Sequence, residues 1–349
     1  MRSSTLLACL WLAGCVGPED LPGGTGAAGG GGGKADEGSG AGETFTPAAP
    51  REGNLRVATF NIRNFPVEPP QEGQIGSPLS YSLETDQDEL LEVLAGLRFE
   101  VLAVQEIRDT AAFDALLERL SSATGGDWQA RWSVNASGNE QHVGLVFDAT
   151  RVALDDLREH PEVDVSGTLR PGLSAQLTSL VGGVDFRAMV VHLASGDSNK
   201  RRDLRATQVA AIATVMSALA QETGEADAVV LGDMNTAGGD EELPALDAVM
   251  AEAALRRAAG PMACTAYWVK KSTNPLVRPS LLDQVYLGSF AERDDEVPVL
   301  AGGHCAVHAC ERFESRDDAS GGTFWDVSDH CPVYFEVRDE DRDEADAAP

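Results

Sequence analysis

The chain has 349 residues and a formal net charge of −29 at pH 7, from 56 acidic and 27 basic side chains. This length suits one large domain with flanking segments, and no stretch beyond the N-terminus is long and apolar enough to cross a bilayer. The acidic balance excludes binding by overall positive charge, so a nucleic-acid partner, whose phosphates are bound mostly by Lys and Arg, would need a local basic cleft.

Residues 1–14 have the features of a processed export signal. Arg2 supplies positive charge, 6–12 an apolar run, and Leu12-Ala13-Gly14-Cys15 a cleavage point. This ending resembles the lipobox of bacterial lipoproteins, which implies lipidation of Cys15; an ordinary secretory signal is the alternative. We expect an exported protein held by its lipid at a bacterial membrane, facing the periplasm or the cell surface.

Residues 15–53 comprise Cys15 and a tether that is rich in glycine, alanine and acidic residues. The tether shows no apolar periodicity, so it cannot bury enough surface to fold. Residues 54–337 then carry the folded domain, and residues 338–349 form an acidic tail expected to be disordered. No segment suggests a protein partner, and we expect a monomer.

Apolar runs and alternating patterns predict a series of strands with few helices between them. The strands are expected at 55–61, 101–105, 128–134, 143–147, 173–180, 184–192, 228–232, 282–287 and 331–337. The helices are expected at 86–97, 111–120, 200–221 and 241–254. Because strands outnumber helices, we expect an α+β sandwich of sheets with outer helices rather than a regular parallel barrel.

Polar side chains follow several of these strands. Asp233 and Asn235 would share a face if their strand continued, and could then take a proton from a water and hold that water. The same pair could also be ordinary turn material. Glu106 and Asn61 stand at the ends of two other strands and offer the hard oxygen ligands suited to Mg²⁺, with Mn²⁺ or Ca²⁺ as alternatives.

Two histidines complete the set. His192 ends an apolar run, and Asp329 and His330 directly precede the last strand. Asp283 lies inside an apolar strand, where an acid is costly unless paired, and His330 would satisfy it. Taken singly, each could be structural: a capped core histidine, a His–Asp pair or a core salt bridge.

Taken together and in this order, the motifs resemble the endonuclease/exonuclease/phosphatase superfamily over Val57–Val337. Ala58–Phe65 and Val104–Asp109 are most similar to its deoxyribonuclease I branch. The resemblance implies a four-layer α/β/β/α sandwich of two mixed sheets. It also implies a divalent-metal-dependent phosphodiester hydrolase, and an exported deoxyribonuclease in particular. Rival expectations are a sphingomyelinase-like phospholipase or another phosphatase of the same fold, and a non-catalytic binding module.

The resemblance implies a role for each matching position. Glu106 and Asn61 would bind the metal, with Asp329 as a supporting metal or hydrogen-bond group. Asp233 would activate the attacking water, and Asn235 would orient it.

The histidines take the remaining roles. His192 and His330 would stabilise the charged transition state and assist the leaving oxygen, and Asp283 would orient His330. The chain departs from deoxyribonuclease I at Asn139-Glu140-Gln141, where that enzyme has Tyr-Lys-Glu. This makes Gln141 the expected partner of His192. In deoxyribonuclease I the Tyr-Lys-Glu segment contacts a groove of duplex DNA, so the resemblance does not carry that contact over to this chain.

Local positive charge bears on the substrate, for which DNA is the expected partner. Arg63 and Arg108 each follow a proposed metal ligand by two positions, and Arg170 is similar to a phosphate-contacting position of the family. Lys200-Arg201-Arg202 opens a predicted helix just after His192. These groups could form a positive cleft on an acidic body, although the triple could equally be a solvated helix end.

Four cysteines remain beyond the signal and Cys15, an even number in an exported protein: Cys264, Cys305, Cys310 and Cys331. Three complete pairings are possible, among them a local bridge between Cys305 and Cys310. Cys331 could instead be a buried free thiol. A zinc site made by His304, Cys305, His308 and Cys310 is a further alternative, although its spacing fits no common finger.

Overall fold

The computed structural model of the chain describes residues 47–66, 84–236, 242–258, 260–269, 277–288, 290, 292, 298–313 and 327–342. The predicted signal, Cys15, most of the predicted tether and residues 343–349 lie outside this set. None of the helices in these ranges is long and apolar enough to cross a membrane.

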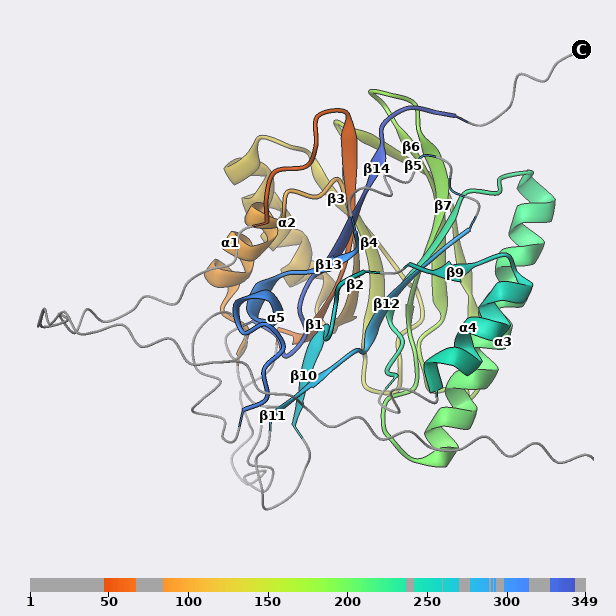
Figure 1. Ribbon diagram of the computed structural model, residues 1–349. Coiled ribbons are helices and arrows are strands. Elements are labelled where there is room, and N and C mark those ends of the chain that lie inside the picture. Colours follow the sequence, from red (N-terminus) through yellow and green to blue (C-terminus); the bar gives the residue numbers. More distant parts are fainter. Residues whose placement is uncertain are drawn as a thin grey trace, which may run out of the picture. The chain divides into compact units, whose positions relative to one another are not determined.

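Two six-stranded sheets form the centre of the domain (Figure 1). The first runs in the order β13-β14-β1-β2-β4-β3. Its strands are β1 (Asn54–Phe65), β2 (Val101–Ile107), β3 (Trp128–Trp132), β4 (His142–Asp148), β13 (Leu300–Ala301) and β14 (Val333–Arg338). The sheet is mixed, because β1 pairs with β2 in parallel and with β14 antiparallel.

The second sheet runs in the order β5-β6-β7-β8-β12-β9 and is also mixed, with β7 and β8 parallel. Its strands are β5 (Val152–His160), β6 (Gly172–Ser179), β7 (Asp185–His192), β8 (Ala228–Asp233), β9 (Arg256–Arg257) and β12 (Asp283–Leu287). A separate ribbon pairs β10 (Ala266–Val269) with β11 (Val277–Ser280).

Helices cover the outer face of each sheet, which makes four layers (Figure 1). α1 (Gln87–Leu97) and α2 (Thr110–Thr124) pack against the first sheet, and α3 (Asn199–Thr223) and α4 (Glu242–Glu252) against the second. The short helices η1 (Pro161–Val163) and α5 (Gly303–Val307) lie in connections. The predicted four-layer α/β/β/α sandwich is confirmed.

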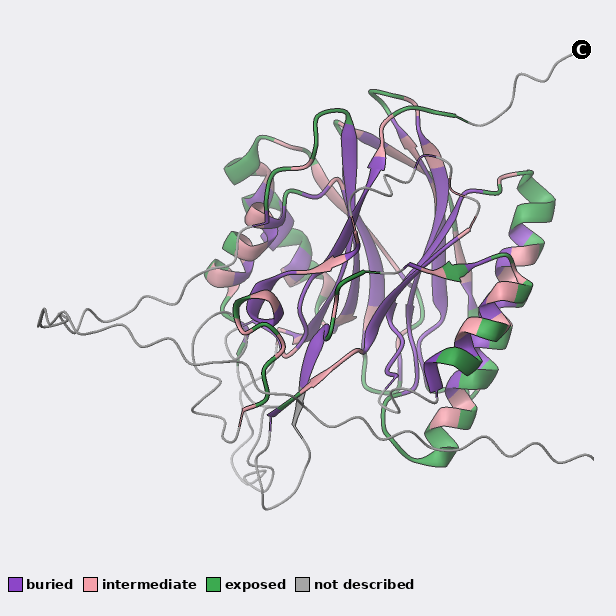
Figure 2. Ribbon diagram, in the orientation of Figure 1, coloured by how far each residue is buried: buried purple, intermediate pink, exposed green. Residues whose placement is uncertain are grey.

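The central strands are buried on both faces, as Figure 2 shows. In β7, Ala188 and Val190 join the apolar cluster between the sheets, whereas Met189 and Val191 join the cluster beneath α3. Alternate side chains of a strand point to opposite faces, so a strand covered on both sides reads as a continuous apolar run. Full burial of a side chain such as Met189, Val190 or Val191 stabilises the fold by about 1.5–3 kcal/mol, and this packing fixes the strand end where His192 stands.

Element boundaries differ from the sequence-based prediction where local chemistry decides them. The helix predicted at 200–221 spans Asn199–Thr223, because the Ser198 side chain accepts from the Arg201 N–H and Gly224 ends the helix at a φ of 79°. β5 was not predicted. It is an edge strand of mostly polar residues with a register shift, so it lacks the apolar pattern of a central strand.

The two ends of the domain meet in the first sheet. Asn54 pairs with Arg338 in the β1–β14 ladder, and the buried Arg56 guanidinium lies 2.9 Å from a Glu336 carboxylate oxygen. Past the predicted domain end at 337, the Asp339 N–H donates to the Gly53 carbonyl at 2.7 Å. Thus the first residues of the predicted acidic tail hydrogen-bond to the sheet.

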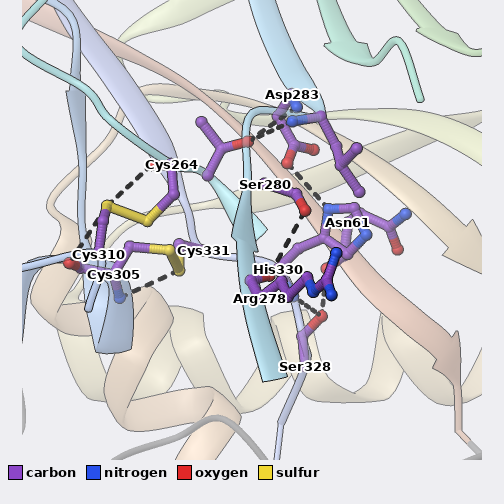
Figure 3. Close-up of a disulfide and its surroundings, with 12 residues drawn as sticks. Asn61, Cys264, Arg278, Ser280, Asp283, Cys305, Cys310, Ser328, His330 and Cys331 are labelled. Atoms are coloured by element: carbon purple, nitrogen blue, oxygen red, sulfur yellow. Dashed lines mark hydrogen bonds and ion pairs between the residues drawn. A yellow bond between two sulfur atoms is a disulfide. The ribbon is translucent and has the colours of Figure 1, made fainter. Parts of the chain in front are cut away.

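Two disulfides join Cys264 to Cys310 and Cys305 to Cys331 (Figure 3). The alternatives of a local Cys305–Cys310 bridge and of a free Cys331 thiol are therefore wrong. The zinc alternative is wrong as well, because both of its cysteines are oxidised. The loop between Cys305 and Cys310 instead brings each of these residues to a partner distant in sequence.

Candidate functional site

A cleft of about 700 Å³ opens where strands of both sheets end. The residues lining it include most of the predicted site: Arg63, Glu106, Arg108, Arg170, His192, Asp233, Asn235, Asp329 and His330. Asn61 and Asp283 lie behind this surface, each hydrogen-bonded to a lining residue. The structure thus gathers residues from both sheets at one point.

Sheet register brings three of these side chains into adjacent positions. Asp233, the last residue of β8, pairs with His192 on β7 and with Asp283 on β12. Residues directly opposite on neighbouring strands project to the same face about 5 Å apart. The first sheet contributes Asn61, whose Nδ2 donates to Asp233 Oδ2 at 2.9 Å. The site therefore spans the seam between the two sheets.

Asp233 is the central acid. Its Oδ1 accepts from the Asn235 N–H at 2.8 Å, and its Oδ2 lies 3.3 Å from His192 Nε2 and 3.8 Å from His330 Nε2. The pKa of Asp233 is raised to about 7, mainly by burial and further by the charges of Asp283 and Glu106, against the opposing charge of His330. A carboxyl that titrates near neutrality can accept a proton from water and later release it.

Asn235 reaches the cleft by a turn and not, as expected, by strand alternation. β8 ends at Asp233, and Asn235 has a left-handed φ of 51°. Asn tolerates this conformation because its side chain bonds locally; here Nδ2 donates to the Leu193 carbonyl at 3.1 Å. Its side-chain oxygen is then the atom suited to accept a hydrogen bond from water.

Glu106 also departs from regular strand geometry, with a φ of 63° at a register shift in β2. Its Oε2 accepts from the Asn64 N–H at 3.0 Å. Burial raises the pKa of Glu106, and the charge of Asp329 raises it further, although His330 and Arg170 oppose this. A bound cation would offset the repulsion between such closely spaced, buried carboxylates.

These oxygen donors suit a hard divalent cation. Glu106, His192 and Asp233 each place a ligand atom within 4.8 Å of the others. Asp329 adds a carboxylate to the same cleft, and Asn61 an amide next to Asp233. Carboxylate and amide oxygens are the ligands of Mg²⁺, Mn²⁺ and Ca²⁺, so the residues present fit the implied metal.

His330 is oriented by hydrogen bonds at both its ring and its backbone. Its Nδ1 lies 2.8 Å from Asp283 Oδ2, and its backbone N–H donates to Ser328 Oγ, which itself donates to the Asn61 carbonyl. Figure 3 shows this set. Burial lowers the pKa of His330, but Asp283 and Asp233 outweigh it, so the pKa lies well above its usual value. The ring is held as a cation with Nε2 towards Asp233.

His192 has the opposite character. Burial first, then the charges of Arg170 and His330, hold the pKa of His192 well below its usual value. Its predicted partner was wrong: Gln141 Nε2 donates to Asn64 Oδ1 at 2.8 Å instead. Among the described residues, none accepts from or donates to the buried Nδ1 of His192. An uncharged imidazole can still donate one hydrogen bond to a bound ligand.

The three predicted arginines all line the cleft. Arg63 itself has a positive φ of 29°, and its N–H donates to Asn61 Oδ1. Arg108 is a third exposed and lies 3.7 Å from Glu140. Part of the Arg170 guanidinium is already hydrogen-bonded within the protein, because Nε and Nη2 donate to the His192 and Leu193 carbonyls. Burial lowers the pKa of Arg170 to about 10, so it remains cationic near neutral pH.

A buried layer behind the cleft was missed. Arg205 on α3 forms a buried ion pair with Glu242 and donates from Nη1 to the Ala194 and Gly196 carbonyls, which precede and line the cleft wall. The available signal was a charged residue on the apolar stripe of α3, one face with Ile212 and Leu219. Thr265, which holds the backbone of Asp283, gave no signal in the sequence.

No protein-family model and no curated protein match the sequence, whereas the fold matches that of several solved structures. D. rerio TDP2 complexed with single-strand DNA product aligns at a TM-score of 0.53 and 16% identity, covering 81% of this chain and 98% of that one. An endonuclease/exonuclease/phosphatase family protein from Bacteroides thetaiotaomicron aligns at 0.52 and 14%, covering 81% and 97%. The mannosyl-6-phosphatase of that organism aligns at 0.51 and 15%, covering 80% and 98%. The chain has the endonuclease/exonuclease/phosphatase fold.

Proposed function

We propose that the protein is a divalent-metal-dependent phosphodiester hydrolase and that its substrate is DNA. The observation that carries this proposal is the meeting of Asp233 on β8, Glu106 on β2 and His330 just before β14 in one cleft lined by arginines. A phosphodiester is anionic and repels hydroxide. Its hydrolysis needs a base for water, positive charge at the phosphoryl oxygens and a proton for the leaving oxygen.

Asp233 is the base in this proposal. Deprotonated, it accepts a proton from water held by the side-chain oxygen of Asn235, while the bonds from Asn61 and the Asn235 backbone fix the carboxylate. A positioned base contributes about 10²–10⁴-fold to rate. Charge neutralisation of the phosphate is what a divalent ion supplies when bound by Glu106, Asp329 and Asn61.

The two histidines divide the remaining work. Cationic His330, held by Asp283, presents Nε2 to the cleft and can stabilise developing negative charge or protonate the leaving oxygen. Neutral His192 can donate a hydrogen bond to a phosphoryl oxygen. Arg170 holds the backbone beneath His192 and adds a positive charge to the wall.

Positive charge around the cleft supports an anionic polymer as substrate. Arg63 and Arg108 line it, and Arg201 at the start of α3 lies against Gly196 on its rim. This local positive charge supports an anionic substrate despite the net charge of −29. TDP2, of the same fold, was crystallised with a single-strand DNA product, which favours nucleic acid among the phosphoesters.

The test is a substrate panel with the purified protein and Mg²⁺, Mn²⁺ or Ca²⁺. The arms are duplex DNA, single-stranded DNA, RNA, sphingomyelin, mannose 6-phosphate and a chromogenic phosphodiester. We expect DNA degradation that a chelator abolishes and that Asp233→Asn lacks. Turnover of sphingomyelin or the sugar phosphate alone would replace DNA with that substrate class, and silence in every arm would leave a binding module.

The proposed location is a bacterial membrane, where a lipid on Cys15 would hold the domain so that it faces the periplasm or the cell surface. The Leu-Ala-Gly-Cys sequence and the glycine-rich segment after it support this. Cys15→Ala should release the protein from the membrane fraction, and continued retention would contradict the anchor.

A further inference from the structure

The acid–imidazole pair Asp283 and His330 stands on two segments that are far apart in sequence. His330 precedes β14 of the first sheet, while Asp283 begins β12 of the second. Their 2.8 Å hydrogen bond therefore depends on a connection across the seam of the sandwich. The described residues contain such a connection at Thr265.

Thr265 is fully buried and hydrogen-bonds to the backbone of Asp283 and to that of Cys331, the residue after His330. Its Oγ1 accepts from the N–H groups of Leu282 and Asp283 at 3.0 and 2.9 Å. Its carbonyl accepts from the Cys331 N–H at 2.8 Å, next to His330. A hydroxyl oxygen can accept two hydrogen bonds, so the Thr265 side chain can hold both N–H groups at the start of β12. The Thr265 backbone carbonyl holds the residue after His330.

The segment around Thr265 is itself firmly held. Ala266 forms a β-bridge with His330, and the Thr265 N–H donates to the Ser280 carbonyl. Cys264 is bridged to Cys310, and Cys331 to Cys305 (Figure 3). The hydroxyl is thus an acceptor on a firmly held segment just before β10, beside Asp283 and His330 but outside the cleft lining.

We infer that Thr265 is a positioning residue that sets the distance between Asp283 and His330 for the proposed reaction. Without the hydroxyl, two buried N–H groups at the start of β12 lose their acceptor and the strand end shifts to recover one. Because a displacement of about 1 Å in a catalytic group can cost about 10²-fold in rate, the effect falls on turnover. Thr265 does not line the cleft, so substrate binding should change little. This inference rests on the proposed function.

The test compares Thr265→Val, which keeps the shape and removes the acceptor, with Thr265→Ser, which keeps the acceptor. Ser174→Ala is the matched control, since it removes a buried hydroxyl that bonds to His160 at 2.8 Å on β6, away from the cleft. With the substrate found in the panel, we expect Thr265→Val to lower kcat by about 10–100-fold with KM within about threefold. Thr265→Ser and Ser174→Ala should keep kcat near wild type.

A second readout needs no activity. In protein labelled with ¹⁵N-histidine, the Nδ1 proton of His330 bonded to Asp283 should give a low-field resonance, assigned by its loss in His330→Gln. We expect this resonance in wild type and Thr265→Ser, and its broadening or upfield shift in Thr265→Val. An unchanged resonance and kcat in Thr265→Val would overturn the inference. A missing activity in wild type with the resonance pattern as expected would overturn the proposed function alone.

Discussion

Nε2 of His330 and Oδ2 of Asp233 lie 3.8 Å apart, although one residue precedes the last strand of the first sheet and the other ends a central strand of the second. One group is held as a cation and the other titrates near neutral pH. An acid and a base whose pKa values are set apart by their surroundings are what a two-proton hydrolysis requires.

Replacing Asp233 by Asn should abolish most turnover and leave the fold intact. The amide cannot accept the proton from water, so kcat should fall by about 10²–10⁴-fold. Steady-state rates on the substrate found in the panel, with circular dichroism for the fold, measure this. The control is Asp185→Asn at the start of the neighbouring strand β7, whose other end carries His192; this variant should keep full activity. A near-normal kcat in Asp233→Asn would remove this carboxylate from the mechanism.

Asp283 and His330 should act as one unit. Asp283→Asn and His330→Gln should each lower kcat, and the double variant should be little worse than His330→Gln alone, because Asp283 acts through the ring it orients. A double-mutant cycle of kcat measures the coupling. Additive losses would show that the two residues contribute independently and would contradict the pairing.

Metal binding and pH should act together on stability. The pKa of Asp233 is raised from 3.8 to about 7, so the folded state holds this proton more tightly than the unfolded state. The unfolding free energy from this group therefore falls as pH rises from about 4 to about 7; the raised pKa values of Glu106 and His330 act in the same direction.

Mg²⁺ should counter that loss. The cation binds the deprotonated carboxylates, so its stabilisation, about 2.7 kcal/mol at roughly 100 times its Kd, should be larger at about pH 8 than at about pH 5. Thermal melts with and without Mg²⁺ at both pH values measure this. Equal shifts in Tm at the two pH values would argue against a site built on these acids, and Glu106→Gln should remove the metal effect.

Arg108 and Glu140 offer a test of substrate charge. Glu140 lies 3.7 Å from Arg108 at the cleft rim, so it competes with a phosphate for the guanidinium. Arg108→Gln should raise KM for DNA and lower its salt slope by about 1, whereas Glu140→Gln should lower KM. Arg119→Gln on α2, which lies outside the cleft lining, is the control. An unchanged salt slope in Arg108→Gln would mean that this arginine contacts no phosphate.

The disulfides should stabilise the domain to similar extents. They close loops with sequence separations of 46 and 26 residues, which predicts a loss of about 3–4 kcal/mol of unfolding free energy for each pair replaced by serines. Urea unfolding under non-reducing conditions measures the loss. Removing Cys305–Cys331, which directly follows His330, should also lower kcat more than removing Cys264–Cys310. Equal activity in both variants would contradict a role of the Cys305–Cys331 disulfide in holding His330.

The strand pattern predicted an α+β sandwich, and the resemblance to the endonuclease/exonuclease/phosphatase superfamily implied its four layers and the roles of the site residues. The positions themselves stood out because each acid or histidine lies within an apolar strand or directly beside one. Local geometry was less accessible. Glu106 and Asn235 adopt positive φ values that strand alternation does not foresee. Gln141 was assigned to His192 by its place in the sequence alone, whereas its side-chain amide donates to Asn64 Oδ1. The cysteine pairing depends on how distant loops meet, which spacing does not contain.

The pairing of Asn54 with Arg338 means that the domain's first and last strands are direct neighbours. A short linker could therefore join the two ends, and the chain could be opened at Gly125, which ends α2 in an exposed turn, without breaking any strand of the cleft. The architecture of this fold is thus compatible with circular permutation, and its cleft does not depend on where the polypeptide begins.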